Sequence, residues 1–276
     1  MALMNSLTVG GTIVHFCETP SAFDQITLFF MGDHIECNEG IVGRLNKPAG
    51  VLKALAPKFP RSRIVVVRPQ RYEQECYAVH EGFLPATTRD GEPLGHPPEA
   101  FTALRQLETI LRATQSQGRE TILVGFSKGG VVLNQVLSEL VHLEGLGSAM
   151  KEETAGSPDA SGGNVHDLKQ LEDTAKHISV LHYVDVGLNS RGAYPTDPRV
   201  LNVVPQIAAS RPFRMAFYGT PRQWEDPRRP FMKAEKDRCL KLLSEAGARC
   251  THRMYYENEP LSLEMHFAII DDFDPA

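Results

Sequence analysis

Residues 121–129, with the sequence TILVGFSKG, place a Gly-x-Ser-x-Gly motif directly after a short apolar run. The next stretch, residues 131–143, carries apolar side chains at helical spacing. A Gly-x-Ser-x-Gly motif between a buried strand and a helix is the nucleophile elbow of α/β-hydrolases. We therefore predict an α/β-hydrolase fold, with Ser127 presented at the carboxyl edge of a mostly parallel sheet.

The two glycines of the motif have a steric role in this prediction. The turn around Ser127 is so tight that a Cβ atom at Gly125 or Gly129 would clash with nearby backbone. The N–H groups that follow the serine open a helix, and the helix dipole favours an anion at that end. Ser127 is therefore predicted to be a nucleophile, and the alternative is a glycine-rich turn with an N-capping serine.

An oxyanion hole requires backbone N–H groups that converge on the developing negative charge. We expect one from Lys128 and a second from Gly32 or Asp33, which follow an early apolar run. Lys128 departs from the apolar residue that is common after the nucleophile. Its ammonium group is expected either to point to solvent or to attract an anionic substrate.

The order of elements along the chain supports the same fold. Apolar runs at 25–31, 63–68, 178–186, 213–218 and 250–256 alternate with helical patterns, which predicts βαβ units with helices on both faces of the sheet. Residues 144–163 are rich in glycine, serine and acidic side chains, and we expect a flexible surface insertion there. Residues 187–212 are expected to form a short cap. Residues 1–276 are predicted to be a single domain.

Composition excludes several other classes. The chain has 276 residues, 42% of them hydrophobic, a net charge of −5 and a pI of about 6.1, so we predict no nucleic-acid partner. Its five cysteines show no Cys-x-x-Cys spacing and indicate free thiols rather than a disulfide framework or a zinc site. There is no apolar run of about 20 residues for a transmembrane segment and no clear presequence. We expect an intracellular protein of the cytosol or the mitochondrion.

The catalytic base is predicted from chain order. In α/β-hydrolases the triad runs serine, acid, histidine, and the histidine follows the last strand. His252 and His266 are the histidines beyond the candidate acids, and His252 falls within the expected last strand. His266 is therefore predicted to be the base in the loop after that strand. The alternative is a core histidine within the amphipathic stretch 263–270.

The sequence leaves more than one candidate for the acidic residue of the triad. Asp226, in the loop after the strand at 213–218, is the first choice because a helix and a strand separate it from His266. Glu225 is adjacent, and Asp185 ends the preceding strand. Both stay open as alternatives at this point. Asp197 is interpreted as a turn residue.

Four segments carry a resemblance to a known family: 125–135 (GFSKGGVVLNQ), 29–33 (FFMGD), 183–187 (YVDVG) and 219–221 (GTP). They are similar to a eukaryotic family known by a chromosome-2 open-reading-frame name, some of whose animal members are mitochondrial. The resemblance covers most of the chain and implies an α/β-hydrolase fold and a mitochondrial location. It implies no known substrate. Asp185 is part of the resemblance, so it stays an alternative acid.

These observations predict a serine hydrolase that acts on a small-molecule ester or related acyl compound through an acyl-serine intermediate. Ser127 would be the nucleophile, His266 the general base and then acid, and Asp226 or Asp185 the orienting carboxylate. Such chemistry needs no metal and no organic cofactor. The alternative is a catalytically silent α/β-hydrolase-fold protein that acts as a binding or scaffolding partner. The sequence predicts no particular protein partner.

Overall fold

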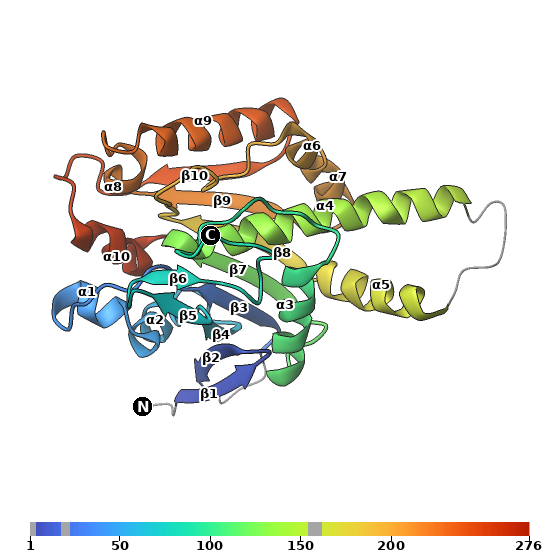
Figure 1. The fold of residues 1–276 in the computed structure, drawn as a ribbon, viewed down its shortest axis with the longest axis horizontal. Helices are drawn as coiled ribbons and strands as arrows, with labels where there is room; N and C mark the ends of the chain where they lie inside the picture. The colour runs from blue at the N-terminus through green and yellow to red at the C-terminus, as the bar shows by residue number, and fades with distance from the viewer. Residues whose placement is uncertain (1–3, 18–22, 154–161, 276) are drawn as a thin grey trace.

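An eight-stranded sheet forms the centre of the computed structural model, which describes residues 4–17, 23–153 and 162–275 (Figure 1). Its strands are β1 (Met4–Val9), β2 (Thr12–Cys17), β3 (Gln25–Phe30), β4 (Ser62–Val67), β7 (Glu120–Phe126), β8 (Ile178–Val184), β9 (Arg214–Gly219) and β10 (Cys250–Met254). They lie in the order β1-β2-β4-β3-β7-β8-β9-β10. Strand β2 is antiparallel to both of its neighbours, and the strands from β4 to β10 pair in parallel. The predicted mostly parallel sheet is confirmed.

The central strands owe their continuous apolar sequences to burial on both faces. Every residue of β8 is buried, and in β3 and β7 only the first residue is not. Parallel strands covered by helices on both sides lose the alternation of apolar and polar side chains. The strands predicted from the apolar runs are confirmed within a few residues.

The hairpin of β1 and β2 was not predicted. Gly10 and Gly11 join the two strands, and both have positive φ angles of 54° and 78°. A two-residue hairpin turn needs such left-handed backbone, which glycine adopts without a steric penalty. The Gly-Gly pair was the available sequence signal for this hairpin.

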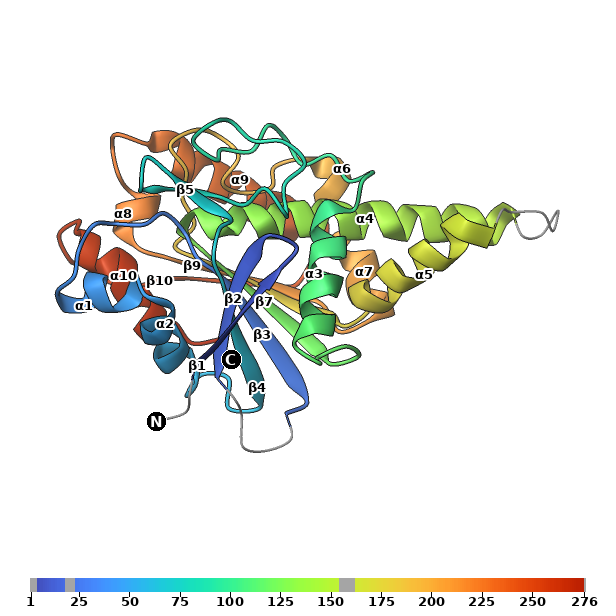
Figure 2. The same ribbon diagram turned by 60° about the horizontal axis from the view of Figure 1, so that its bottom comes forward.

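Helices cover both faces of the sheet, as Figure 2 shows. They are α1 (Gly40–Leu45), α2 (Pro48–Leu55), α3 (Thr102–Ala113), α4 (Gly130–Glu153), α5 (Gly162–Ala175), α6 (Pro198–Leu201), α7 (Val204–Ser210), α8 (Pro221–Trp224), α9 (Pro230–Glu245) and α10 (Leu263–Asp272). One apolar core lies between the sheet and helices α1, α2 and α10. The other lies between the sheet and helices that include α3, α4 and α9. A separate two-stranded sheet joins β5 (Arg71–Glu73) and β6 (Tyr77–Val79).

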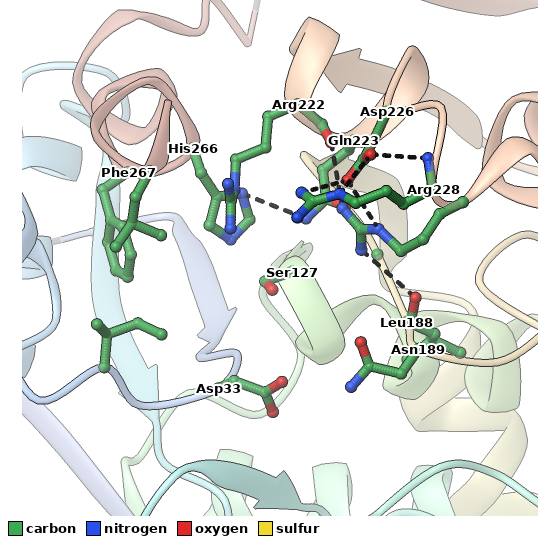
Figure 3. Close-up of a pocket in the computed structure, with 14 residues that line it drawn as sticks. Asp33, Ser127, Leu188, Asn189, Arg222, Gln223, Asp226, Arg228, His266 and Phe267 are labelled. Carbon is green, nitrogen blue, oxygen red and sulfur yellow. Dashed lines mark hydrogen bonds and ion pairs between the residues drawn. The ribbon is translucent and has the colours of Figure 1, made fainter. Parts of the chain in front are cut away.

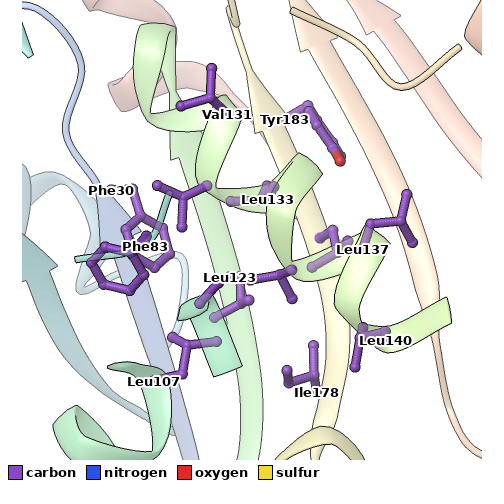
Figure 4. Packing of buried hydrophobic residues seen from close by; sticks show 14 of the residues in the cluster. Phe30, Phe83, Leu107, Leu123, Val131, Leu133, Leu137, Leu140, Ile178 and Tyr183 are labelled. Carbon is purple, nitrogen blue, oxygen red and sulfur yellow. The ribbon is translucent and has the colours of Figure 1, made fainter. Parts of the chain in front are cut away.

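Helix α4 is held against the sheet by a row of leucines (Figure 4). Leu133, Leu137 and Leu140 are buried in the same cluster as Leu123 of β7 and Ile178 of β8. Burying each such side chain contributes about 1.5–3 kcal/mol. This packing fixes the start of α4, and therefore the turn at Ser127, relative to the end of β7.

Two loop predictions differ from the structure. Residues 144–153, expected in a flexible insertion, continue α4, because their leucine, alanine, methionine, lysine and glutamate residues favour helix enough to offset two glycines. Residues 154–161 of that prediction lie outside the described residues. In the expected cap at 187–212, helices α6 and α7 pack on α4, and α6 also packs on α9. Only the beginning of this segment, residues 187–189, lines the pocket that contains Ser127.

Candidate active site

Ser127 sits in the tight turn between β7 and α4 that the motif predicts. Its φ angle is +52°, a strained left-handed conformation for a residue with a side chain. A Cβ atom on Gly125 would lie 2.7 Å from the Cα of Gly130, and one on Gly129 would lie 2.2 Å from the carbonyl oxygen of Phe30. Both contacts are far too short, so the two glycines allow the turn to close.

The loop after β3 packs directly on the serine. A Cβ atom on Gly32 would lie 2.4 Å from the Cβ of Ser127 and 3.0 Å from its Oγ. Among the described residues, the backbone N–H groups of Gly32 and Asp33 donate to no acceptor. The early loop predicted to supply an oxyanion donor is therefore next to Ser127, with two N–H groups that are available to a ligand.

His266 lies on helix α10, not in a loop as predicted. The Ser262 side chain caps this helix by accepting a hydrogen bond of 3.1 Å from the Met265 N–H. His266 is buried, and its ring stacks on Phe126 of the elbow with 4.6 Å between ring centroids. Helix and stacking together restrict the imidazole to one position.

The carboxylate that contacts His266 is Asp185. Its Oδ2 lies 2.6 Å from the histidine Nδ1. A carboxylate only accepts hydrogen bonds, so Nδ1 carries the hydrogen and Nε2 is left with its lone pair. Thr220 holds the same carboxylate twice, through its N–H at 2.6 Å and its hydroxyl at 2.9 Å. Asp185 is fully buried and has a φ angle of +44°.

Asp226, the first choice for the acid, is placed differently. Its carboxylate forms no hydrogen bond with His266 and is occupied by two arginines. Arg228 donates to both oxygens at 2.9 Å, and the Arg229 Nε donates at 3.4 Å. These cations hold the pKa of Asp226 well below its usual range, chiefly through the hydrogen bonds from Arg228. The geometry thus favours Asp185 over Asp226 as the partner of the histidine, because the Asp226 carboxylate is bound by Arg228 and Arg229 of its own loop.

Lys128 does neither of the two things expected of it. Its side chain is 1% exposed, so it does not point to solvent, and two carboxylates already neutralise its charge. Its Nζ lies 3.2 Å from Asp33 and 3.4 Å from Glu92, and it donates a hydrogen bond of 2.8 Å to the Asp90 carbonyl. Lys128 directly follows Ser127, so its ion pair with Asp33 connects the turn at the serine to the loop after β3.

Asp33 remains partly open to the pocket. Its carboxylate accepts a hydrogen bond of 2.8 Å from the Ala78 N–H as well as the contact with Lys128. Burial raises the pKa of Asp33, and the Lys128 charge offsets part of that rise. Asp33 is therefore held by two fixed partners beside Ser127.

Ser127 and His266 line one pocket of about 380 Å³ (Figure 3). Its wall also includes Asp33, Leu188, Asn189, Arg222, Gln223, Asp226, Arg228, Arg229 and Phe267. The Ser127 hydroxyl forms no hydrogen bond with the described residues. Across the described ranges, no group of three or more His, Cys, Asp or Glu side chains is arranged to hold a metal ion.

Sequence reasoning missed three contributors to this site. Thr220 fixes Asp185, Gln223 lies 3.4 Å from the His266 Nδ1, and Arg222 lines the pocket. All three belong to the turn after β9 and the short helix α8. The Gly-Thr-Pro sequence at 219–221 was the available signal, since proline at the first helical position marks a helix start.

A family model described as C2orf69 matches residues 112–249, which is half of the chain. The chain belongs to the C2orf69 family. The resemblance drawn from the elbow segment is therefore confirmed, and the matched range runs from the end of α3 to the residue before β10.

Curated C2orf69 relatives extend the similarity. The mitochondrial protein C2orf69 homolog of Danio rerio is 25% identical over 243 residues, which cover 79% of this chain and 62% of that protein. The mitochondrial protein C2orf69 of Homo sapiens is 29% identical over 153 residues, which cover 55% of this chain and 33% of that protein. This chain thus spans less than two thirds of the length of these relatives.

A solved structure supports the fold alone. A candidate carboxylesterase from Lactobacillus plantarum superposes with a TM-score of 0.50 and 13% identity, covering 97% of this chain and 91% of that one. The C2orf69-family chain has the α/β-hydrolase fold. In the part of the chain that the structure describes, no helix has the length and apolar character to span a membrane.

Proposed function

We propose that this chain is a serine hydrolase that cleaves an ester or related acyl bond through an acyl-serine intermediate. The observation that carries the proposal is the 2.6 Å contact between the buried Asp185 and His266, which lines the same pocket as Ser127. A serine hydroxyl is a weak nucleophile without an imidazole to take its proton and a carboxylate to orient that imidazole. The strained elbow at Ser127, the buried His266 and the buried Asp185 support the proposal because they match these three requirements.

The proposed reaction has two steps. The Ser127 Oγ attacks the carbonyl carbon while Nε2 of His266 takes the hydroxyl proton. The resulting oxyanion is bound by the backbone N–H of Lys128 and that of Gly32 or Asp33. When the carbonyl re-forms, the bond to the leaving alcohol breaks and His266 gives it the proton. Water then attacks the acyl-serine, passes a proton to His266, and the carboxylic acid leaves as Ser127 recovers its proton.

Labelling with a fluorophosphonate probe tests this proposal, because the probe reacts covalently with an activated serine. We expect wild type to be labelled, Ser127→Ala to be unlabelled, and His266→Ala to react at least about 1,000-fold more slowly. Matched controls are Ser210→Ala and His252→Ala, which replace exposed residues of the same types on α7 and β10. Both should label like wild type.

The opposite result has a clear meaning. If folded wild-type protein is not labelled, the serine is not activated, and the chain is better explained as a silent α/β-hydrolase-fold protein that binds a partner. Circular dichroism of each variant separates loss of activation from loss of folding.

The names of the relatives bear on location. Both relatives described above are named as mitochondrial proteins, which supports the mitochondrion rather than the cytosol for this chain. Subcellular fractionation of the natural protein distinguishes the two, and recovery in the cytosolic fraction alone would contradict the mitochondrial assignment.

A further inference from the structure

Three arginines line the pocket beside Ser127, all from the segment after β9. They are Arg222, Arg228 and Arg229. In Figure 3, Arg222 and Arg228 lie on one side of Ser127, and Asp33 lies on the other. Cations gathered at one wall of a pocket create a positive potential that attracts an anionic group of a ligand.

Two of these arginines already donate hydrogen bonds to acceptors of the protein. Arg228 holds Asp226 with two hydrogen bonds of 2.9 Å. Arg229 donates to Asp226 at 3.4 Å, to the Leu188 carbonyl at 3.5 Å and to the Arg222 carbonyl at 3.1 Å. Because one carboxylate serves two guanidinium groups, this part of the wall keeps one positive charge in excess.

Arg222 has no such partner. None of the described carboxylates or carbonyls forms an ion pair or hydrogen bond with its guanidinium group. The side chain is half-buried, and burial lowers the pKa of Arg222, with the Arg229 charge acting in the same direction. A guanidinium nevertheless stays protonated in proteins, so Arg222 presents a cation with unused donors to the pocket.

Other cations near the serine cannot serve in its place. The Lys128 ammonium is buried and paired with Asp33 and Glu92. On the Asp33 side of the pocket one lysine faces two carboxylates, which leaves one negative charge in excess, whereas the Arg222 side has an excess of positive charge. The asymmetry gives a ligand a preferred direction, with its reacting carbonyl at Ser127 and its charged end toward α8.

We propose that the pocket selects an acyl substrate bearing a carboxylate or phosphate group, which Arg222 binds. This inference rests on the proposed hydrolase function and specifies its substrate class. The planar fork of a guanidinium matches the two oxygens of a carboxylate or phosphate, and the pairing is strongest where water is partly excluded. The same chemistry covers both anions, and the experiment separates them.

The test compares two series of p-nitrophenyl esters of equal chain length. One consists of monoesters of glutarate, adipate and pimelate, which end in a carboxylate; the other consists of the matching neutral fatty acyl esters. We expect wild type to hydrolyse at least one anionic ester with a kcat/KM about 10- to 100-fold above its neutral match, since a hydrogen-bonded charge pair contributes that range of discrimination. Added salt should reduce this preference.

Arg222→Gln should abolish the preference, because it lowers kcat/KM for the anionic esters about 10- to 100-fold more than for their neutral matches, with which no charge pair forms. Arg222→Lys should keep part of it, since the charge remains but the fork is lost. The matched control is Arg112→Gln, which removes an exposed arginine of α3 paired with Glu108. It should keep the wild-type preference.

Inorganic phosphate and acetate then serve as competitors of the preferred ester. Stronger Arg222-dependent inhibition by phosphate assigns the anionic group to a phosphate, and stronger inhibition by acetate assigns it to a carboxylate. The proposal is overturned if no anionic ester is preferred, or if Arg222→Gln slows both series equally. If neither series is hydrolysed and Ser127 is not labelled by the fluorophosphonate, the hydrolase function fails and this inference fails with it.

Discussion

The turn after β8 and the loop after β9 each bring an aspartate to the same edge of the sheet, but the two carboxylates have different partners. Asp185 contacts His266 and Thr220, and among the described residues no lysine or arginine forms a hydrogen bond or ion pair with it. Asp226 is enclosed by Arg228 and Arg229. A carboxylate that orients a histidine and stabilises its imidazolium has to accept the Nδ1–H hydrogen bond, and Asp185 is in that contact whereas Asp226 is not. The difference shows that the partners of a carboxylate, and not only its position after a strand, indicate its role.

The largest effect should come from replacing these two aspartates in turn. Asp185→Asn should lower kcat for a neutral p-nitrophenyl ester by about 1,000- to 10,000-fold, because the amide cannot hold the histidine tautomer that accepts the serine proton. Asp226→Asn should stay within about tenfold of wild type, because its carboxylate contacts arginines and not the base. Steady-state kinetics and the rate of fluorophosphonate labelling measure both.

The reverse result would exchange the two roles. If Asp226→Asn loses activity and Asp185→Asn does not, the contact between Asp185 and His266 is not the catalytic one. Thermal unfolding of both variants is the control, since Asp185 is fully buried and its replacement also changes the hydrogen bonds of Thr220.

Much of this arrangement follows from local sequence. The elbow at Ser127 is predictable because its glycines, the preceding apolar run and the following helix pattern all lie within one short stretch. The parallel strands are predictable because burial on both faces leaves continuous apolar runs. Chain order selects His266 over His252, since the former follows the last strand.

The choice between the acids was not predictable in the same way. Asp185 and Asp226 both follow parallel strands, so spacing alone cannot separate them. The deciding features are the left-handed backbone of Asp185 and its contacts with Thr220, which is 35 residues away. The burial of Lys128 had no local signal either, because it depends on two loops that meet only in the folded chain.

The charge of Lys128, the residue after Ser127, is expected to have a structural role because it is buried between two carboxylates. Lys128→Met should lower the free energy of unfolding by about 3–5 kcal/mol, because it leaves the carboxylates of Asp33 and Glu92 without their buried cation. The matched control is Lys176→Met, which removes an exposed lysine paired with Asp173 and should cost about 0–1 kcal/mol. Urea denaturation measures both.

Adding Asp33→Asn to Lys128→Met should restore part of the lost stability, since one unpaired charge is then removed. If Lys128→Met is as stable as Lys176→Met, the buried cluster does not hold the loop after β3, and the link between the two sides of the proposed oxyanion hole is lost.

The smallest effect concerns the dependence of stability on pH at Asp226. Its pKa in the folded protein lies below the usual 3.8 because Arg228 stabilises the charged form. The carboxylate therefore contributes stability above about pH 3.8, and that contribution is lost as the pH falls through the lower folded value. Because the Arg228 side chain is 76% exposed, solvent screens the pair, and we expect Asp226→Asn to cost about 1–2 kcal/mol at neutral pH.

Urea denaturation of wild type and Asp226→Asn across the acid range measures this difference. The gap between the two proteins should be widest at neutral pH and should narrow as the pH falls below about 3.8, where wild type begins to lose the same interaction. Asp197→Asn is the matched control, since Asp197 also has its pKa lowered by an arginine, Arg199, but in a more exposed pair, so its replacement should change stability by only about 0–1 kcal/mol at neutral pH and less in acid. A gap at Asp226 that stays constant with pH would mean that its ion pairs do not stabilise the loop. The contrast with Asp185 would then have to rest on catalysis alone.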